Sequence, residues 1–209
     1  MNLKYKTLIT ALLSAAALVL FSCEKDDDTG SVSFVTAYPE FEMAGDRYVS
    51  VVQGETFTDP GVVAREGGEE IEVTVSGEVD TSTPGVYDIT YSAVNSDNFS
   101  GSTTRTVAVL AAPEQAGVDI SGAYVRSGVT ANVTKLAPGF YLMSNVWGPN
   151  LIPGYLVTAN GTDITIAEAA LSGFGPVSGS GTLDDGTLVL LVTLSNYGIV
   201  DSRREWEAQ

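Results

Sequence analysis

Apolar and polar residues alternate one by one along much of this chain, and that pattern constrains the fold more than any other feature of the sequence. Residues 71–76 read Ile-Glu-Val-Thr-Val-Ser, and residues 87–93 read Tyr-Asp-Ile-Thr-Tyr-Ser-Ala. Such alternation places apolar side chains on one face of a half-buried strand. Beyond residue 36, no segment sustains the i, i+3, i+4, i+7 spacing of an amphipathic helix, and Gly, Pro, Asn and Asp recur at short intervals. The sequence therefore predicts an all-β chain.

The chain begins with features of a secretory signal peptide at residues 1–22. Lys4 and Lys6 precede an apolar run over residues 8–21, and the only cysteine of the chain, Cys23, follows it. As a helix the run would reach about 21 Å, which is short of the ~30 Å hydrocarbon core of a bilayer. We therefore expect a cleaved leader and not a membrane span. A single unpaired thiol is unusual in a secreted protein, although an ordinary leader with an accidental cysteine is the alternative.

The residues around the cysteine resemble the signals of Bacteroidota lipoproteins. Residues 20–23 read Leu-Phe-Ser-Cys and are similar to a lipobox, which implies that the sulfur of Cys23 carries diacylglycerol. The acidic residues that follow resemble an export signal, which implies display on the outer face of the outer membrane. This signal consists of Lys25, Asp26, Asp27 and Asp28. A solvated tether over residues 23–36 is a compatible interpretation, because clustered like charges favour disorder.

Composition excludes several classes of function. The formal net charge is −16, so phosphate backbones would be repelled and nucleic acid is not an expected partner. The chain has no histidine, which excludes Ser-His-Asp and Cys-His catalysis and the usual His/Cys zinc sites. The acidic runs lack the spacing of a calcium loop. A pair of carboxylates remains a catalytic option, but the acids of the C-terminal part mostly fall in turns or at strand ends. We expect no enzymatic activity, no cofactor and no metal.

A first domain is expected over residues 37–112. Residues 54–62 read Gly-Glu-Thr-Phe-Thr-Asp-Pro-Gly-Val, residues 83–93 contain a Thr-Pro-Gly turn before an alternating strand, and residues 104–109 form a last strand. These blocks, in this order, resemble a bacterial immunoglobulin-like (Ig-like) repeat of extracellular proteins. The resemblance implies an Ig-like β-sandwich that acts as a spacer or adhesion module and has no catalytic residues.

A second domain is expected over residues 113–209. Turn signals occur at residues 137–139 (Ala-Pro-Gly), 160–161 (Asn-Gly) and 184–186 (Asp-Asp-Gly), each between strand-like runs. They predict an antiparallel meander of seven or eight strands, closed as a small barrel or packed as a sandwich. The arrangement resembles the lipocalin-like C-terminal domains that accompany Ig-like modules in Bacteroidota lipoproteins. Residues 188–194 are almost wholly apolar, so we expect both faces of that strand to be covered, by a loop or the first domain, or by a ligand or second copy.

The loop over residues 144–155 is the best candidate site. Trp147 precedes Gly148 and Pro149, where a regular strand is unfavourable, so its indole would be displayed for stacking on a sugar ring. The other residues expected at this site are Tyr155, Asn145, Asn150 and Phe174. The alternative is that Trp147 and Tyr155 only plug one end of a barrel. Residues 172–181 are rich in glycine but lack the lysine and spacing of a phosphate loop, so we expect a flexible loop there.

Together these features predict a non-catalytic lipoprotein of the outer membrane, anchored by lipid and facing the extracellular side. The leading hypothesis is a binding module for an extracellular ligand such as a glycan. A structural or protein-interaction subunit of a cell-envelope assembly is the alternative, and a carrier of a small apolar ligand is a further one.

Overall fold

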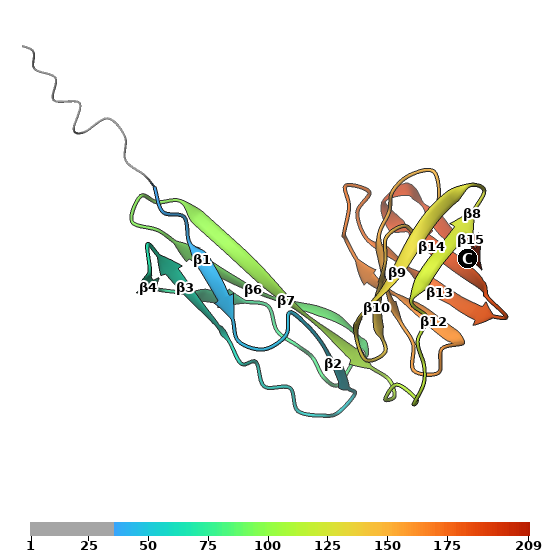
Figure 1. Cartoon of the computed structure of the whole chain (residues 1–209), viewed down its shortest axis with the longest axis horizontal. Helices are drawn as coiled ribbons and strands as arrows, with labels where there is room; N and C mark the ends of the chain where they lie inside the picture. Colours follow the sequence, from blue (N-terminus) through green and yellow to red (C-terminus); the bar gives the residue numbers. More distant parts are fainter. Residues whose placement is uncertain (1–35) are drawn as a thin grey trace, which may run out of the picture. The chain divides into compact units, whose positions relative to one another are not determined.

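The computed structural model describes residues 36–209 (Figure 1). The signal peptide, the lipidation site and the export signal predicted from the sequence lie outside the described residues; they comprise Cys23, Lys25, Asp26, Asp27 and Asp28. Within residues 36–209 the only helical element is a short 3₁₀ turn, η3 (Ser195–Tyr197). No helix in this part of the chain has the length and apolar character needed to cross a membrane. The fold is therefore all-β where it is described, as the alternation predicts.

Two sheets form the first part of the fold (Figure 1). The three-stranded sheet runs in the order β1 (Glu40–Met43), β3 (Val62–Glu66) and β4 (Glu69–Ile71). The four-stranded sheet runs in the order β2 (Tyr48–Val52), β7 (Ser100–Leu110), β6 (Gly85–Val94) and β5 (Thr74–Ser76). Strand β2 pairs parallel with β7, and the other pairs are antiparallel. Buried side chains such as Ile89, Tyr91 and Val107 form the core of this sandwich.

A buried arginine fastens strand β7 to the turn between β1 and β2. Arg105 is 1% exposed, and its Nε lies 3.1 Å from a carboxylate oxygen of Asp59. Its other nitrogens donate hydrogen bonds of 2.6 Å to the carbonyl oxygens of Ala44 and Asp46. The hydroxyl of Tyr91 donates to the same carboxylate at 2.6 Å. A buried charge is tolerated in a fold only when it is paired in this way.

The single strand predicted over residues 71–76 is wrong. Strand β4 ends at Ile71 in one sheet, and β5 begins at Thr74 in the other, so the chain crosses between sheets within the alternating segment. Because β5 is an edge strand, Val75 is 54% exposed and not half-buried. Alternation records which residues are apolar, but it does not record which sheet they join.

The second part is a closed barrel of eight antiparallel strands (Figure 1). Its strands are β8 (Gly122–Arg126), β9 (Val129–Ala137), β10 (Phe140–Met143), β11 (Gly154–Val157), β12 (Asp163–Ala169), β13 (Val177–Asp184), β14 (Thr187–Leu194) and β15 (Ile199–Ala208). Each strand pairs with the next in sequence, and β15 closes the barrel on β8. The three predicted hairpins are confirmed. Asp185 and Gly186 both have positive φ, as a two-residue type I′ turn requires.

Side chains fill the barrel interior. Trp206, Tyr141, Met143, Leu156 and Leu190 are among the residues that are almost completely buried in one cluster inside it. An eight-stranded barrel is just wide enough for its own side chains to fill. This packing leaves the hypothesis of a small apolar ligand carried inside the barrel without support.

Strand β14 has one covered face. Leu188, Leu190 and Val192 point inward and are fully buried, whereas Val189 and Leu191 point outward and remain partly exposed. Within this single chain the outward face of residues 188–194 is only partly covered, because strands of an eight-stranded barrel bury only alternate residues in its interior. Coverage of the outward face by a ligand or a second copy stays a prediction.

The glycine-rich segment over residues 172–181 was expected to be a loop, but its second half is strand β13. A Cβ on Gly179 would lie 2.0 Å from the carbonyl oxygen of Leu191, and one on Gly181 would lie 2.5 Å from that of Val189. Both contacts are impossible for a larger residue. The glycines therefore allow the backbone of β13 to lie close to that of its neighbour β14, which is a packing role.

Glu114 ties the segment that leads into the barrel to the β9–β10 hairpin. Its carboxylate accepts hydrogen bonds from the Nζ of Lys135 at 2.8 Å, the hydroxyl of Tyr141 at 2.7 Å and the backbone N–H of Gly139 at 2.8 Å. Burial raises the pKa of Glu114, but these hydrogen bonds outweigh it and hold the pKa below its usual value of 4.5. Burial and the bond to Glu114 raise the pKa of Tyr141 to about 12.

Candidate functional site

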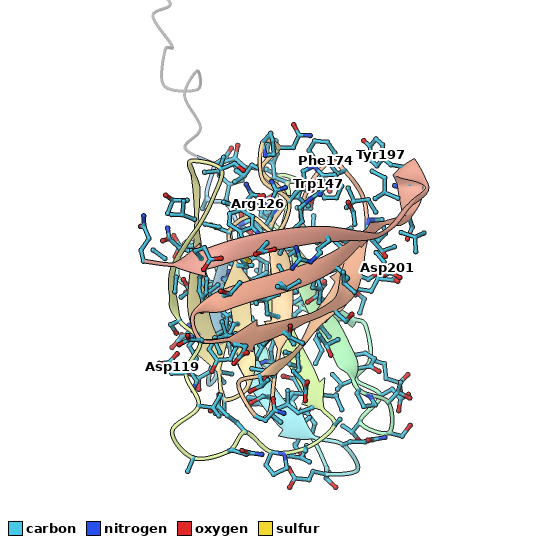
Figure 2. All side chains as sticks on the ribbon, turned by 90° about the vertical axis from the view of Figure 1, so that its right-hand side faces the viewer. Asp119, Arg126, Trp147, Phe174, Tyr197 and Asp201 are labelled. Atoms are coloured by element: carbon cyan, nitrogen blue, oxygen red, sulfur yellow. The ribbon has the colours of Figure 1, made fainter. Side chains whose placement is uncertain are left out.

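The up-and-down order of the strands sorts the connections of the barrel into two sets, one at each end. The loop end, as we name it, carries the turn at residues 127–128, the loops at 144–153 and 170–176, and the connection at 195–198. The opposite end carries the shorter turns of the three predicted hairpins. Figure 2 shows Arg126, Trp147, Phe174 and Tyr197 together at the loop end, and Asp119 at the opposite end. Residues far apart in the sequence therefore meet at the loop end.

Asn145 organises the loop that carries Trp147. Its side chain is 2% exposed, and its Oδ1 accepts hydrogen bonds from the backbone N–H groups of Trp147, Gly148 and Ile152 at 3.0, 3.1 and 3.3 Å. Its Nδ2 donates to the carbonyl oxygen of Gly148 at 2.6 Å. Val146 and Ile152 are buried in the barrel core on either side of this turn. The loop is therefore held in one conformation from both of its ends.

Trp147 both covers the barrel core and remains partly exposed to solvent. The guanidinium carbon of Arg204 lies 3.6 Å from the centre of the indole ring, which is a close cation–π stack. Trp147 therefore packs against the barrel core, as the plug interpretation predicts, while display of its indole for a sugar ring stays a prediction.

Further aromatic and apolar side chains lie around Trp147 at the loop end. The ring centres of Phe174 and Tyr197 are 5.9 Å apart, so the loop at 170–176 and the connection at 195–198 contact each other. Tyr197 is 56% exposed, and the apolar side chains of Leu151 and Val200 are 69% and 71% exposed. Large apolar side chains that stay this exposed in one region are typical of a surface that binds a ligand or a partner.

A groove on the outer surface of the barrel, between β15 and β8, lies next to this surface. The ladder between β15 and β8 has only two pairs, Glu207 with Val125 and Ala208 with Tyr124. Where this ladder ends lies the groove, of about 400 Å³, and its lining residues are Val125, Arg126, Ser127, Arg203, Glu205 and Glu207. Arg126 follows directly after Val125, the last residue of β8 that pairs with β15, so it lies at the end of the ladder.

Two arginines at the loop end have no carboxylate partner within the described residues, Arg126 and Arg204. Burial, and next the positive charge of Arg126, lower the pKa of Arg204 below its usual value. The loop end therefore holds two arginines that lack a carboxylate partner among the described residues, in a chain whose formal net charge is −16.

The structure brings together some of the site residues predicted from the sequence. Trp147 and Phe174 share the loop end, and Asn150 is exposed in the same loop. Asn145 lies in the same loop, but its side chain is used in hydrogen bonds to the loop backbone. Tyr155 is elsewhere: it lies on the outward face of β11, is 8% exposed, and packs with its ring 5.0 Å from that of Phe140.

The sequence reasoning missed Arg126 and Arg204. The signal was available, because each stands two residues from an inward-facing aromatic, Tyr124 or Trp206, and so belongs to the inward face of its strand. A basic residue at such a position is a departure from the alternating pattern. Within residues 36–209, no three acidic side chains gather in a group that could hold a metal ion.

Comparison with protein families places a known domain type in the first part of the chain. Residues 41–109 match the family "Bacterial surface protein, Ig-like domain". The match confirms the Ig-like resemblance predicted from the sequence, and the two sheets described above supply its sandwich. A comparison with curated proteins finds no match.

Three solved structures are distantly similar to this chain. A lipoprotein from Bacteroides thetaiotaomicron is 27% identical, with a TM-score of 0.41, and the match covers 81% of this chain and 100% of that one. A structure of Clostridium perfringens ZmpB, with its catalytic domain and two carbohydrate-binding modules, is 13% identical with a TM-score of 0.34, covering 64% of this chain and 15% of that one. A ZmpB structure with GlcNAc is 14% identical with a TM-score of 0.32, covering 61% and 31%. These TM-scores are too low to transfer a site.

Proposed function

We propose that this protein is a non-catalytic, surface-exposed lipoprotein of the outer membrane that binds an extracellular glycan at the loop end of its barrel. The observation that carries the proposal is the set of aromatic side chains that three separate connections bring to one end, Trp147, Phe174 and Tyr197 (Figure 2). Ligand sites of proteins combine such aromatic surfaces with a few well-placed polar groups. Here the polar groups are the guanidinium groups of Arg126 and Arg204.

The location is supported by two features of the chain. The domain at residues 41–109 is of a type described for bacterial surface proteins. Acylation at Cys23 would then anchor the chain, since each buried methylene contributes about 0.8 kcal/mol and two acyl chains hold a protein stably. Mass spectrometry of the native protein should find diacylglycerol on Cys23, and an unmodified thiol would contradict the anchor.

The absence of catalysis is supported by the residue types present. The chain has no histidine. Of the acids that line the groove, Glu205 pairs with Arg203, and Glu207 accepts a hydrogen bond from Thr187. Carboxylates whose oxygens are already paired within the protein are less available to a substrate.

Glycan-array binding with matched variants tests the proposal. Trp147→Ala and Phe174→Ala should each lower the affinity for a bound glycan at least tenfold, whereas Gln115→Ala, at an exposed position before β8, should leave it unchanged. The melting temperature, measured on each variant, separates loss of the site from loss of the fold. If the array shows no binding, or if binding survives both aromatic substitutions, the proposal is wrong.

A protein partner is the second candidate function, and a different observation favours it. Leu151, Tyr197 and Val200 are large apolar side chains that remain more than half exposed at the loop end. A protein interface would cover them. Cross-linking on intact cells that captures one envelope protein through Leu151, and loses it in Leu151→Asp, would favour this function over glycan binding.

A further inference from the structure

Two buried hydrogen-bond donors of the barrel lack an acceptor. Among the described residues, the buried side-chain nitrogens without a partner are Nε of Arg204 and Nε1 of Trp206. Both residues belong to the inward face of β15, two positions apart, and so lie about 7 Å from one another along the strand. Buried polar groups are almost always hydrogen-bonded, so each unpaired one calls for an explanation. Two on one face of one strand show that the described part of the chain itself supplies no acceptor at this part of the barrel.

The arginines around these donors also lack a partner of opposite charge within the described residues. Other basic side chains of the described part have polar partners, namely Arg65, Arg105, Lys135 and Arg203 with carboxylates and Arg47 with the hydroxyl of Thr103. Arg126 and Arg204 have no carboxylate partner there, although acids are abundant in the chain. The two arginines also repel each other, and this repulsion contributes to the lowered pKa of Arg204. An anion bound between them would remove the repulsion.

The geometry of Arg204 favours a planar anion. Its Nη1 donates to the carbonyl oxygen of Arg203 at 3.1 Å, and within the described residues its Nε and Nη2 edge has no acceptor. That edge presents two parallel N–H groups, which match the two oxygens of a carboxylate. The stack on Trp147 fixes the plane of the guanidinium before any ligand arrives. A neutral hydroxyl would use these donors less well, because it brings no negative charge to two unpaired cations.

We propose that the loop end binds an acidic sugar, with the carboxylate held by Arg204 and Arg126. The sugar ring then lies against the aromatic side chains of Trp147 and Phe174. This inference rests on the proposed function, since it names the chemical class of glycan that the same site takes.

Paired ligands test the inference on the mature, full-length protein. Isothermal titration compares trigalacturonate with its carboxyl-reduced counterpart, and 3′-sialyllactose with lactose. We expect one acidic sugar to bind at least tenfold more tightly than its neutral partner, and its affinity to fall with added salt. Arg204→Gln and Arg126→Gln should each lower that affinity at least tenfold, whereas Arg47→Gln, an exposed arginine of the first domain, should leave it unchanged.

The outcomes separate the two proposals. Equal binding of the acidic and neutral partners would overturn the acidic-sugar inference and leave glycan binding intact. If none of the four sugars binds, the inference is wrong, and the glycan array decides the proposed function by itself. If Arg204→Gln lowers the melting temperature, its loss of affinity could reflect loss of the fold. Arg126→Gln, at the end of β8, is then the decisive variant. Unchanged affinity in Arg126→Gln at an unchanged melting temperature would then refute the assignment.

Discussion

Removing the guanidinium of Arg105 should destabilise the Ig-like part of the protein severely. The side chain is 1% exposed, pairs with Asp59 at 3.1 Å and donates to the carbonyl oxygens of Ala44 and Asp46 at 2.6 Å. In Arg105→Met the apolar stem keeps its packing, but the carboxylate loses its ionic partner and three carbonyl groups, those of Ala44, Asp46 and Gly61, each lose a donor. The variant therefore isolates the polar interactions from the volume of the side chain.

The expected loss of unfolding free energy is about 3 kcal/mol. Removing one member of a buried ion pair costs about 3–5 kcal/mol. The carboxylate of Asp59 is 25% exposed, so water can partly solvate it in the variant, and this places the loss at the lower end of that range. The costs of the three carbonyl groups overlap with this value, because interactions within one network are not additive.

Urea unfolding with two probes measures this loss. Both tryptophans of the chain, Trp147 and Trp206, belong to the barrel, so tryptophan fluorescence follows the barrel while far-ultraviolet circular dichroism follows both parts. The control is Arg65→Met, which removes an arginine that pairs on the surface with Glu42 and Glu70. We expect a much smaller change for the control, because solvent screens exposed ion pairs.

A small loss in Arg105→Met would refute the reasoning. If its stability falls by less than about 1 kcal/mol, or by no more than that of Arg65→Met, the buried network does not hold β7 to the β1–β2 turn. Amide hydrogen exchange over residues 100–110 gives an independent readout, and protection there should fall in Arg105→Met only.

Three further predictions concern the barrel. Gly179→Ala should lower the free energy of unfolding by about 1–3 kcal/mol, because its Cβ would collide with a backbone carbonyl. Tryptophan fluorescence should show this as a lower melting temperature. Gly173 has open space around it, so Gly173→Ala should change nothing. Asn145→Ala should cost about 1–3 kcal/mol and abolish glycan binding, because three backbone N–H groups lose their acceptor. Gln115→Ala, at an exposed position before β8, should do neither. Glu114 has a pKa below 4.5 in the folded chain, so its charged form stabilises the fold above pH 4.5. This contribution is lost as the pH falls through the folded pKa. Glu114→Gln should therefore make the stability depend less on pH below pH 4.5.

Contrary results would be equally informative. A melting temperature of Gly179→Ala equal to that of Gly173→Ala would show that β13 has room to move away from β14. Retained glycan binding in Asn145→Ala would show that the loop needs no internal acceptor to present Trp147. If stability falls at acidic pH in Glu114→Gln just as it does in the unchanged protein, other carboxylates are responsible for that loss.

Local patterns predicted much of the architecture. The hairpin at residues 184–186 followed from Asp and Gly at positions that need positive φ, and the Ig-like sandwich followed from the order of the blocks over residues 54–109. Closure of the second part into a barrel did not follow, because pairing of β15 with β8 depends on residues more than seventy positions apart, Val125 and Glu207. The alternating segment at residues 71–76 failed for a related reason, since its two halves pair with different sheets.

The candidate site divides in the same way. The sequence by itself determined that the chain is all-β, that it lacks the residues of common catalytic and zinc sites, and that Trp147 lies in an irregular loop, because these depend on composition and on near neighbours. Only the tertiary structure decided that Arg204 stacks on Trp147, that Arg126 stands beside them, and that Tyr155 faces away. The physical reason is that a site on a barrel end gathers residues from alternate connections, and the closure that aligns those connections is a long-range property of the whole sheet.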